Sequence, residues 1–316
     1  MISYDPGNRE WLSTHKQRPI QLSAFVKNTL NLNPKDFHDP ALLEKFKKEI
    51  DAWINKHVMV KYHGLENFPV HDIILGTTHA LDDLHWQHKG RIVVYEKEYR
   101  YHTRLDSVKK ISSYTELEEG DQLIISYPSC VTTDYRKDFF YFLKQDKIKC
   151  DVHIDGAWFG CCRNFEFDVS HPFIKSVFVS LSKAFGMGGN RIGLRYTRQR
   201  QNGFVTIMNE HGYVNRADCL IGLNRMREFG ADYLWKNYST EYTKVCKDWN
   251  LKESNAFHIA IDSDNKFVGI RTPLRYLIDN MFDEHGTDAG LNYFEKKEKE
   301  RFPTADERWP RQGKVI

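Results

Sequence analysis

The residues best suited to chemistry are a lysine and an arginine in a glycine-rich stretch of the chain. Lys183 ends the segment Ser-Leu-Ser-Lys, which begins at Ser180 and follows a short apolar run. A lysine amine in such a loop can form a Schiff base with an aldehyde. Arg191 is a planar cation that could bind an anionic group of the same ligand, and Ser180 can add a hydroxyl. The alternative is a solvent-exposed lysine and arginine on a glycine-rich turn.

A carboxylate closes another apolar run further upstream. Asp155 opens the segment Asp-Gly-Ala-Trp, which ends at Trp158. A carboxylate placed level with the lysine can hold a proton on a pyridine nitrogen, and the protonated ring can then withdraw electrons from a carbanion. The alternative is that Asp155 caps the helix that follows it.

A third signal stands between an apolar run and a helical pattern. Gly76 lets another group approach the backbone closely, and Thr77 and Thr78 follow it. Their backbone amides and hydroxyls, at the start of a helix, could bind a phosphate group. Many turns between a strand and a helix have a similar composition, so this signal is weak by itself.

Taken in order, the three segments resemble the fold type I pyridoxal-phosphate enzymes, and the class I/II aminotransferases in particular. The resemblance covers roughly residues 35–200 and depends mainly on the paired motifs at Asp155 and Lys183. It implies an α/β large domain, with a three-layer αβα arrangement around a mostly parallel sheet, and a smaller α/β domain. It also implies pyridoxal 5'-phosphate as cofactor, an amino acid or amine as substrate, and a homodimer with active sites at its interface.

The resemblance assigns roles to individual residues. Lys183 matches the Schiff-base lysine, which is also the general base, and Asp155 matches the partner of the pyridine nitrogen. Tyr99 stands where the family places an aromatic ring against the cofactor, although Tyr95 and Tyr101 are near it in sequence. The residues that match the phosphate ligands are Gly76, Thr77, Thr78, Ser180 and Arg191.

Two further positions concern the substrate and the cofactor's phenolic oxygen. Arg271 is the best match for the arginine that binds the substrate carboxylate on a strand of the small domain; otherwise it is a surface arginine. Trp158 stands where a tyrosine often donates a hydrogen bond to the phenolic oxygen. An indole N–H can also donate, but with a different reach.

The sequence also departs from the family pattern. The family's Asn-Pro-Thr-Gly-like segment is replaced by Ser126-Tyr-Pro128-Ser, without an asparagine, and Phe37 replaces a tyrosine that binds the neighbouring subunit's phosphate. These changes keep open a decarboxylase, lyase or oxidase-like enzyme with the same cofactor beside the aminotransferase. A degenerate, non-catalytic relative is disfavoured by the intact Lys183 and Asp155, and a different nucleotide by the lack of a G-x-x-x-x-G-K or G-x-G-x-x-G segment.

The elements that must position these residues alternate along the chain. Apolar runs that predict strands alternate with helical patterns, which argues for a largely parallel sheet with its ligand at the carboxyl ends of the strands. We assign residues 41–200 to a large cofactor-binding domain, and residues 1–40 and 201–316 to a smaller domain and arm. The strands are expected at residues 72–75, 91–95, 122–126, 150–155, 176–180, 191–196, 256–261 and 266–271, and the helices from residue 40 and at 137–144, 215–250 and 273–282.

Composition excludes several classes of protein. The 316 residues include 46 basic and 43 acidic side chains, a net charge of +3 that is too small to indicate nucleic-acid binding. No apolar run is long enough for a membrane helix, and the first twenty residues do not resemble a secretory signal, so we expect a cytoplasmic protein. The six cysteines have no metal-ligand spacing, so no metal site is predicted.

Overall fold

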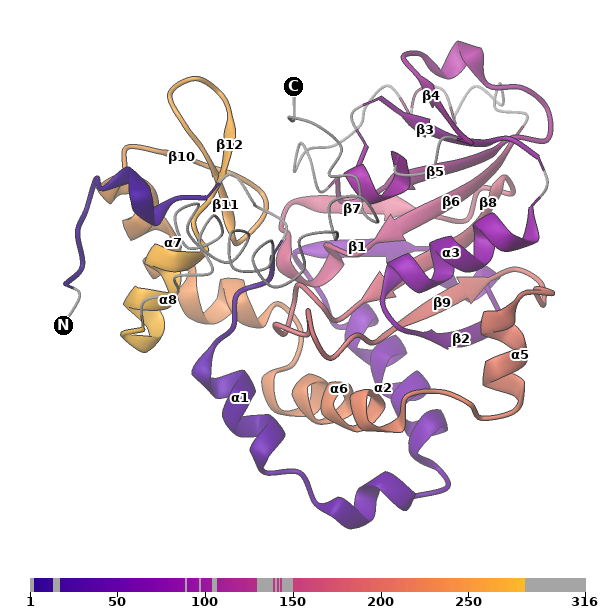
Figure 1. Ribbon diagram of the computed structural model, residues 1–316, viewed down its shortest axis with the longest axis horizontal. Helices are drawn as coiled ribbons and strands as arrows, with labels where there is room; N and C mark the ends of the chain where they lie inside the picture. The colour runs from indigo at the N-terminus through magenta and orange to yellow at the C-terminus, as the bar shows by residue number, and fades with distance from the viewer. Residues whose placement is uncertain are drawn as a thin grey trace, which may run out of the picture. The chain divides into compact units, whose positions relative to one another are not determined.

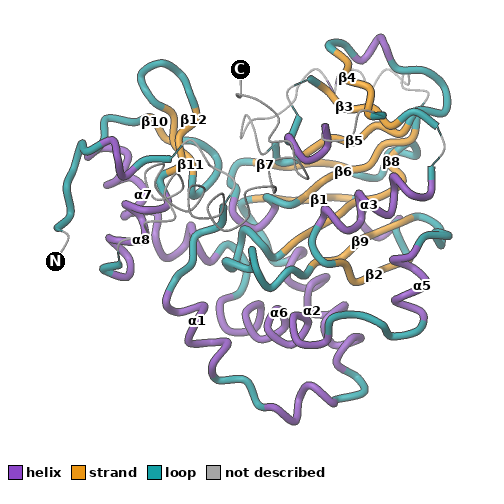
Figure 2. The backbone as a smooth tube through the Cα atoms, viewed as in Figure 1, coloured by secondary structure: helices purple, strands orange, loops and turns teal. Residues whose placement is uncertain are grey.

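A seven-stranded sheet forms the centre of the larger part of the molecule (Figure 1; Figure 2). The computed structural model describes residues 3–13, 18–88, 90–96, 98–103, 107–129, 139, 141, 143 and 150–281. The strand order in the sheet is β2-β9-β8-β6-β5-β3-β4. In chain order its strands are β2 (Val70–Ile74), β3 (Ile92–Tyr95), β4 (Val108–Ile111), β5 (Gln122–Ser126), β6 (Asp151–Gly156), β8 (Ile174–Ser180) and β9 (Gly193–Thr197).

The sheet is mostly parallel, as the sequence predicts. Only β9 runs antiparallel to its two neighbours, β2 and β8, and the other neighbouring strands pair in parallel. The carboxyl ends of all the other strands therefore meet at one edge, where ligands bind in sheets of this kind. The two strands β1 (Val60–His63) and β7 (Phe165–Asp168) pair in parallel outside this sheet.

Helices cover both faces of the sheet. On β9, neighbouring side chains point to opposite faces. The guanidinium of Arg195 bonds Asp83 of α3 at 2.6 Å, and the hydroxyl of Tyr196 lies 3.5 Å from Asp51 of α2. Helices α3 and α2 therefore lie on opposite faces, which gives the expected three layers. The described helices are α1 (Ser23–Leu30), α2 (Leu42–Asn55), α3 (Thr77–Gln87), α5 (Phe204–Glu210), α6 (Arg216–Phe229), α7 (Tyr233–Asp248) and α8 (Arg271–Asp279).

The apolar spacing of the sequence accounts for these layers. Helix α2 buries Phe46, Ile50 and Trp53 at intervals of three and four residues, and it packs against α6. Most of the predicted strands form, whereas the predicted helix over residues 137–144 falls largely outside the described residues. The predicted helix over residues 215–250 is interrupted, because Gly230 ends α6 with a φ of 72° and α7 begins at Tyr233.

A smaller unit has a sheet of its own. Strands β10 (Lys252–Glu253), β11 (Ile259–Ile261) and β12 (Phe267–Gly269) pair antiparallel in that order. Aromatic rings of Tyr4, Trp11, Trp249 and Tyr276 pack together in the same unit, with neighbouring ring centroids 5.3 to 6.0 Å apart. The small unit therefore has its own apolar contacts.

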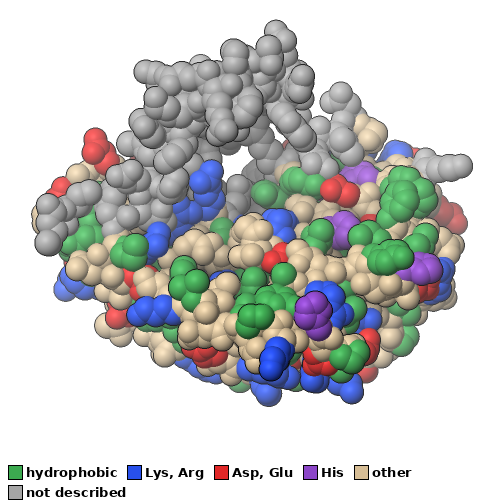
Figure 3. Space-filling view, turned by 60° about the horizontal axis from the view of Figure 1, so that its bottom comes forward, with side chains coloured by type: hydrophobic (Ala, Val, Ile, Leu, Met, Phe, Trp, Pro, Cys, Tyr) green, Lys and Arg blue, Asp and Glu red, His purple; other side chains and the backbone are tan. Residues whose placement is uncertain are grey.

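The division of the chain differs from the predicted one in its boundaries. One compact unit consists of Gln17–Thr240 and Ser254–Phe257 and contains the seven-stranded sheet; the other contains the described residues of Met1–Lys16, Glu241–Glu253 and His258–Ile316. Residues 17–40 and 201–240 thus pack with the large sheet, because α1 and α6 contact each other and α6 contacts α2. Charged side chains of both signs occur across the face seen in Figure 3.

Candidate active site

One cavity at the carboxyl ends of the parallel strands contains most of the residues that the sequence singles out. Its empty volume is about 480 Å³, part of which is open to solvent. All of its lining residues belong to the unit with the large sheet. They are Thr77, Thr78, Tyr99, Ser126, Asp155, Ala157, Trp158, Ser180, Ser182, Lys183 and Arg191.

The turn before α3 and Arg191 form one end of this cavity. The guanidinium of Arg191 donates to the backbone oxygen of Leu75 at 3.2 Å and to the hydroxyl of Thr78 at 2.6 Å. Gly76 has a φ of 74°, and a Cβ at this position would lie 2.7 Å from the Arg191 Nη2 atom. A side chain would therefore displace the arginine. The helix N-terminus, two threonine hydroxyls and one guanidinium together suit an anion such as a phosphate group.

The serines before the lysine shape its loop. Ser180 is buried and donates from its hydroxyl to the Ser182 oxygen at 2.9 Å, while the Ser182 amide donates back to Ser180 at 3.2 Å. The Lys183 Nζ atom lies 5.5 Å from the centroid of the Trp158 ring, within the range of a cation–π contact. The loop thus presents the lysine amine to the cavity beside an aromatic ring.

Asp155 is a buried carboxylate with contacts on both oxygens. Its Oδ1 atom accepts a hydrogen bond from the Ala157 amide at 3.0 Å, and its Oδ2 atom lies 3.2 Å from Nε2 of His102. Sequence reasoning missed His102, a buried histidine that also lies 3.2 Å from the Ser126 hydroxyl. In the sequence, only its position three residues after Tyr99 pointed to His102. One short helical turn brings these two residues close together.

Among the three neighbouring tyrosines, Tyr99 is the one that lines the cavity. Tyr95 stacks on Tyr114 at 5.3 Å, and the hydroxyl of Tyr101 bonds the Asp82 carboxylate at 2.8 Å. The backbone amide of Tyr99 donates to the carboxylate of Glu98 at 3.2 Å. Tyr99 therefore has the position in which an aromatic ring can cover a bound ligand.

The segment that replaces the family's asparagine motif points its large side chain away from the cavity. The ring of Tyr127 packs against Phe165 at 5.5 Å and Phe167 at 4.8 Å, and the side chain is 1% exposed. Ser126, one residue earlier, faces the cavity instead. The strand end therefore offers a hydroxyl where the family has an amide.

Two predicted positions lie elsewhere. Arg271 is not on a strand: β12 ends at Gly269, and Arg271 is the first residue of α8 in the small unit, where it is buried. Phe37 is part of a short 3-10 helix, Pro34–His38, in the unit with the large sheet.

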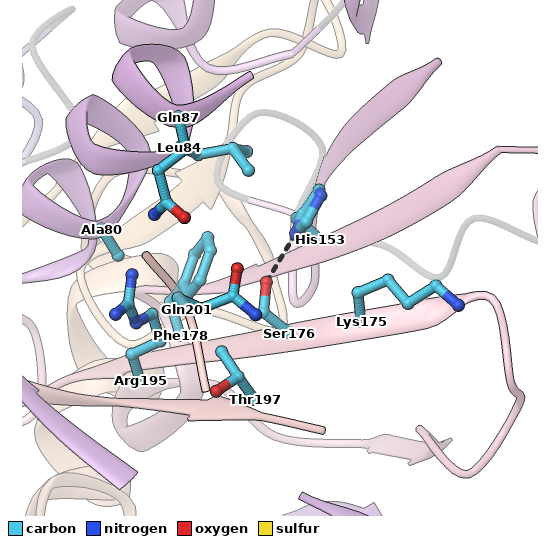
Figure 4. Close-up of a pocket in the computed structure, with 10 residues that line it drawn as sticks. All are labelled: Ala80, Leu84, Gln87, His153, Lys175, Ser176, Phe178, Arg195, Thr197 and Gln201. Atoms are coloured by element: carbon cyan, nitrogen blue, oxygen red, sulfur yellow. Dashed lines mark hydrogen bonds between the residues drawn. The ribbon is translucent and has the colours of Figure 1, made fainter. Parts of the chain in front are cut away.

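A second cavity, shown in Figure 4, lies beneath α3 toward the opposite ends of the strands. Its empty volume is about 270 Å³. His153 lies there between Gln122, 2.9 Å from Nε2, and Ser176, 2.6 Å from Nδ1, and burial lowers its pKa to about 3. The Arg195 guanidinium is bonded at 2.6 Å to two buried aspartates. Because His153 and Arg195 each have polar partners of their own, we assign no catalytic role to this cavity.

Among the described residues, no group of histidine, cysteine, aspartate and glutamate side chains is placed to hold a metal ion. None of the described helices is long and apolar enough to cross a membrane. The cysteines at 150, 161, 162, 219 and 246 are buried free thiols.

Comparison with solved structures identifies the fold of this chain as that of the fold type I pyridoxal-phosphate enzymes. An aminotransferase from Staphylococcus aureus superposes with a TM-score of 0.53 at 12% identity, covering 83% of this chain and 91% of that one. A PLP-bound C-S lyase from Staphylococcus hominis gives 0.55 at 8% identity, over 87% and 91% of the two chains.

A probable N-succinyldiaminopimelate aminotransferase from Thermus thermophilus gives a TM-score of 0.54 at 14% identity, over 85% of this chain and 92% of that one. No protein-family model matches the sequence, and a search of curated proteins finds no similar sequence. At these identities the likeness establishes the fold and leaves the reaction to the chemistry of the site.

Proposed function

We propose that this protein is a pyridoxal-phosphate-dependent aminotransferase that acts on an amino acid and holds its cofactor on Lys183. The observation that carries the proposal is the single cavity that Lys183, Asp155 and Arg191 share. Each residue comes from a different segment, and each has the chemistry that one part of the cofactor requires. The lysine can bind the aldehyde, the carboxylate can bind the ring nitrogen, and the guanidinium can bind the phosphate.

The residues present fit this cofactor. Arg191, Thr77, Thr78 and the backbone at Gly76 would hold the phosphate, and Ser180 can add its hydroxyl. Asp155 is buried, and its carboxylate oxygens can accept a hydrogen bond from a protonated pyridine nitrogen. When bound, the cofactor supplies an electron sink for the substrate's α-carbon.

The remaining chemistry belongs to the protein. Lys183 would hold the aldehyde of the bound cofactor, and its amine would serve as the general base that moves a proton at the substrate's α-carbon. Asp155 would keep the ring nitrogen protonated, and His102 lies 3.2 Å from that carboxylate. Tyr99 would cover the ring and exclude water from it.

A lyase, decarboxylase or oxidase-like reaction with the same cofactor is the second candidate. The observation that favours it is the orientation of Tyr127, together with the lining of the cavity. None of the described residues that line it has the side-chain amide that the family directs at the phenolic oxygen. A panel of amino acids separates the two. An aminotransferase forms one equivalent of keto acid and then needs a second keto acid to continue, whereas the alternatives release ammonia, a thiol or carbon dioxide continuously.

Two further parts of the proposal come from the family resemblance. Arg271 is the candidate for the substrate carboxylate, and a homodimer is the expected assembly.

The direct test is to locate the lysine that binds the cofactor. Purified protein incubated with pyridoxal phosphate should become yellow, and borohydride reduction should leave one cofactor mass on the peptide that contains Lys183. Lys183→Ala should lose both the colour and the mass. Lys175→Ala removes a partly exposed lysine at the second cavity and should behave like the wild type. A cofactor mass on another lysine in the wild-type protein would contradict the assignment.

A further inference from the structure

The hydroxyl of Tyr62 contacts the backbone of a residue next to the candidate site. Tyr62 is on β1, its side chain is buried, and its hydroxyl donates a hydrogen bond to the backbone oxygen of Tyr127. Strand β1 is not part of the seven-stranded sheet, because it pairs with β7. This hydrogen bond therefore joins the sheet's carboxyl edge to a separate element.

Gly156 shows on which side of the sheet this contact is made. A Cβ on Gly156 would lie 2.7 Å from the Tyr62 hydroxyl oxygen and 2.7 Å from the backbone oxygen of Phe178. Side chains of neighbouring strand residues point to opposite faces. The Tyr62 hydroxyl therefore lies on the face opposite the carboxylate of Asp155, in a space that only glycine leaves open.

The contact reaches the residues of the cavity through the backbone. The Tyr127 amide donates to the backbone oxygen of Asp155 at 2.9 Å, and the Tyr127 oxygen accepts from Tyr62. Ser126 precedes Tyr127, and both Ser126 and Asp155 line the cavity. The Tyr62 hydroxyl thus holds the backbone where the end of β5 bonds to the end of β6.

The environment of Tyr62 favours the neutral phenol, which is the form that donates a hydrogen bond. Burial raises its pKa well above 10, and the neighbouring Tyr127, Asp155 and Cys162 raise it further. Around the phenol, Phe159 and Phe167 form an apolar wall, with ring centroids 4.8 and 6.3 Å away. The hydroxyl has a fixed partner and a fixed orientation.

We propose that Tyr62 is a positioning residue, which holds the ends of β5 and β6 so that Asp155 faces the ring nitrogen of the bound cofactor. The inference rests on the proposed function, since it needs the cofactor in this cavity. Tyr62 does not touch the cofactor itself and acts through the backbone of Tyr127 and Asp155.

The test compares two tyrosine-to-phenylalanine variants and two cofactors. Tyr62→Phe removes the hydroxyl beneath the site. Tyr242→Phe removes a matched bond, because the buried Tyr242 hydroxyl donates to the backbone oxygen of Ile259 at 2.9 Å in the small unit. Each protein is titrated with pyridoxal phosphate and with its 1-deaza analogue, which has carbon in place of the ring nitrogen.

For Tyr62→Phe we expect the dissociation constant of pyridoxal phosphate to rise roughly three- to tenfold, as the loss of one hydrogen bond would give. The constant for the deaza analogue should not change, because that analogue has no nitrogen for Asp155 to bind. Tyr242→Phe should leave both constants at their wild-type values.

Three other outcomes would each overturn one of the two proposals. Unchanged binding of pyridoxal phosphate by Tyr62→Phe, or an equal loss for both cofactors, would overturn the positioning role and leave Tyr62 a structural residue. A wild-type protein that binds neither cofactor would instead overturn the proposed function. The wild-type titration therefore separates the two failures.

Discussion

At the scale of single residues, the site depends on how each polar side chain is held. The Asp155 carboxylate is 3% exposed, with the Ala157 amide at one oxygen and His102 near the other. A buried carboxylate without such contacts would be costly, and its orientation would be poorly defined. The contacts with His102 and the backbone thus fix the orientation of Asp155, as its proposed role requires.

Replacing this carboxylate should separate cofactor binding from catalysis. In Asp155→Ala, the contacts at Arg191, Thr77 and Thr78 remain, so the protein should still bind pyridoxal phosphate, more weakly than the wild type. Activity should fall by about a hundredfold or more, because the carboxylate stabilises charge that develops mainly in the transition state. Steady-state rates and cofactor titrations measure the two effects.

Asp168→Ala provides the control for this variant. Asp168 is an exposed residue at the end of β7, outside the cavity, and its loss should change neither quantity. A near wild-type rate for Asp155→Ala would contradict the role in withdrawing electrons.

At the scale of elements, the turn between β2 and α3 forms part of the proposed phosphate site. Gly76 has φ 74° and ψ 170°, a conformation that only glycine adopts readily, and it precedes the first residue of α3 beside the guanidinium of Arg191. The helix supplies the N–H groups, and β9 begins just after the arginine. The proposed anion site therefore lies where two elements distant in sequence meet.

Gly76→Ala should weaken cofactor binding beyond its effect on folding. Gly230 has almost the same conformation, φ 72° and ψ −168°, but a Cβ there has no neighbour within 4 Å. Both alanine variants should lose about 1–3 kcal/mol of stability from backbone strain. Only Gly76→Ala should also raise the dissociation constant of pyridoxal phosphate, by about tenfold, because its methyl group displaces Arg191. Equal affinities in the two variants would argue against the phosphate site.

At the scale of the whole molecule, buried polar groups within the layers affect how stability varies with pH. The row formed by Gln122, His153 and Ser176 crosses three strands beneath α3. Its histidine is neutral in the folded protein, because burial holds its pKa at about 3. An unfolded chain has no such burial, and its histidine has a pKa of about 6.5.

His153 should therefore make the protein less stable as the pH falls from about 6.5 toward 3. In that window the unfolded chain binds a proton that the folded chain does not, which favours unfolding by about 1.4 kcal/mol per pH unit. His153→Gln cannot titrate, so this share of the pH dependence should disappear from its urea unfolding curves. Between pH 7 and pH 5, the wild type should lose about 2 kcal/mol more than the variant. The same loss in both proteins would contradict this account.

The sequence by itself determined the fold class and the order of the chemical groups along the chain. Strands with apolar runs and helices with three- and four-residue spacing are local patterns, so the parallel sheet and the strand ends at Ser126, Asp155 and Ser180 could be predicted. The types of residue at these ends suggested the chemistry. Both signals depend only on neighbours in sequence.

The tertiary structure decided what surrounds those groups. The antiparallel direction of β9, the break at Gly230 and the start of α8 at Arg271 depend on packing that no local pattern records. His102 reaches Asp155, 53 residues away, and Tyr62 reaches Tyr127, 65 residues away. Such contacts are fixed by which elements pack together and which face each side chain occupies, and a periodicity of two or 3.6 residues contains no information about partners so distant.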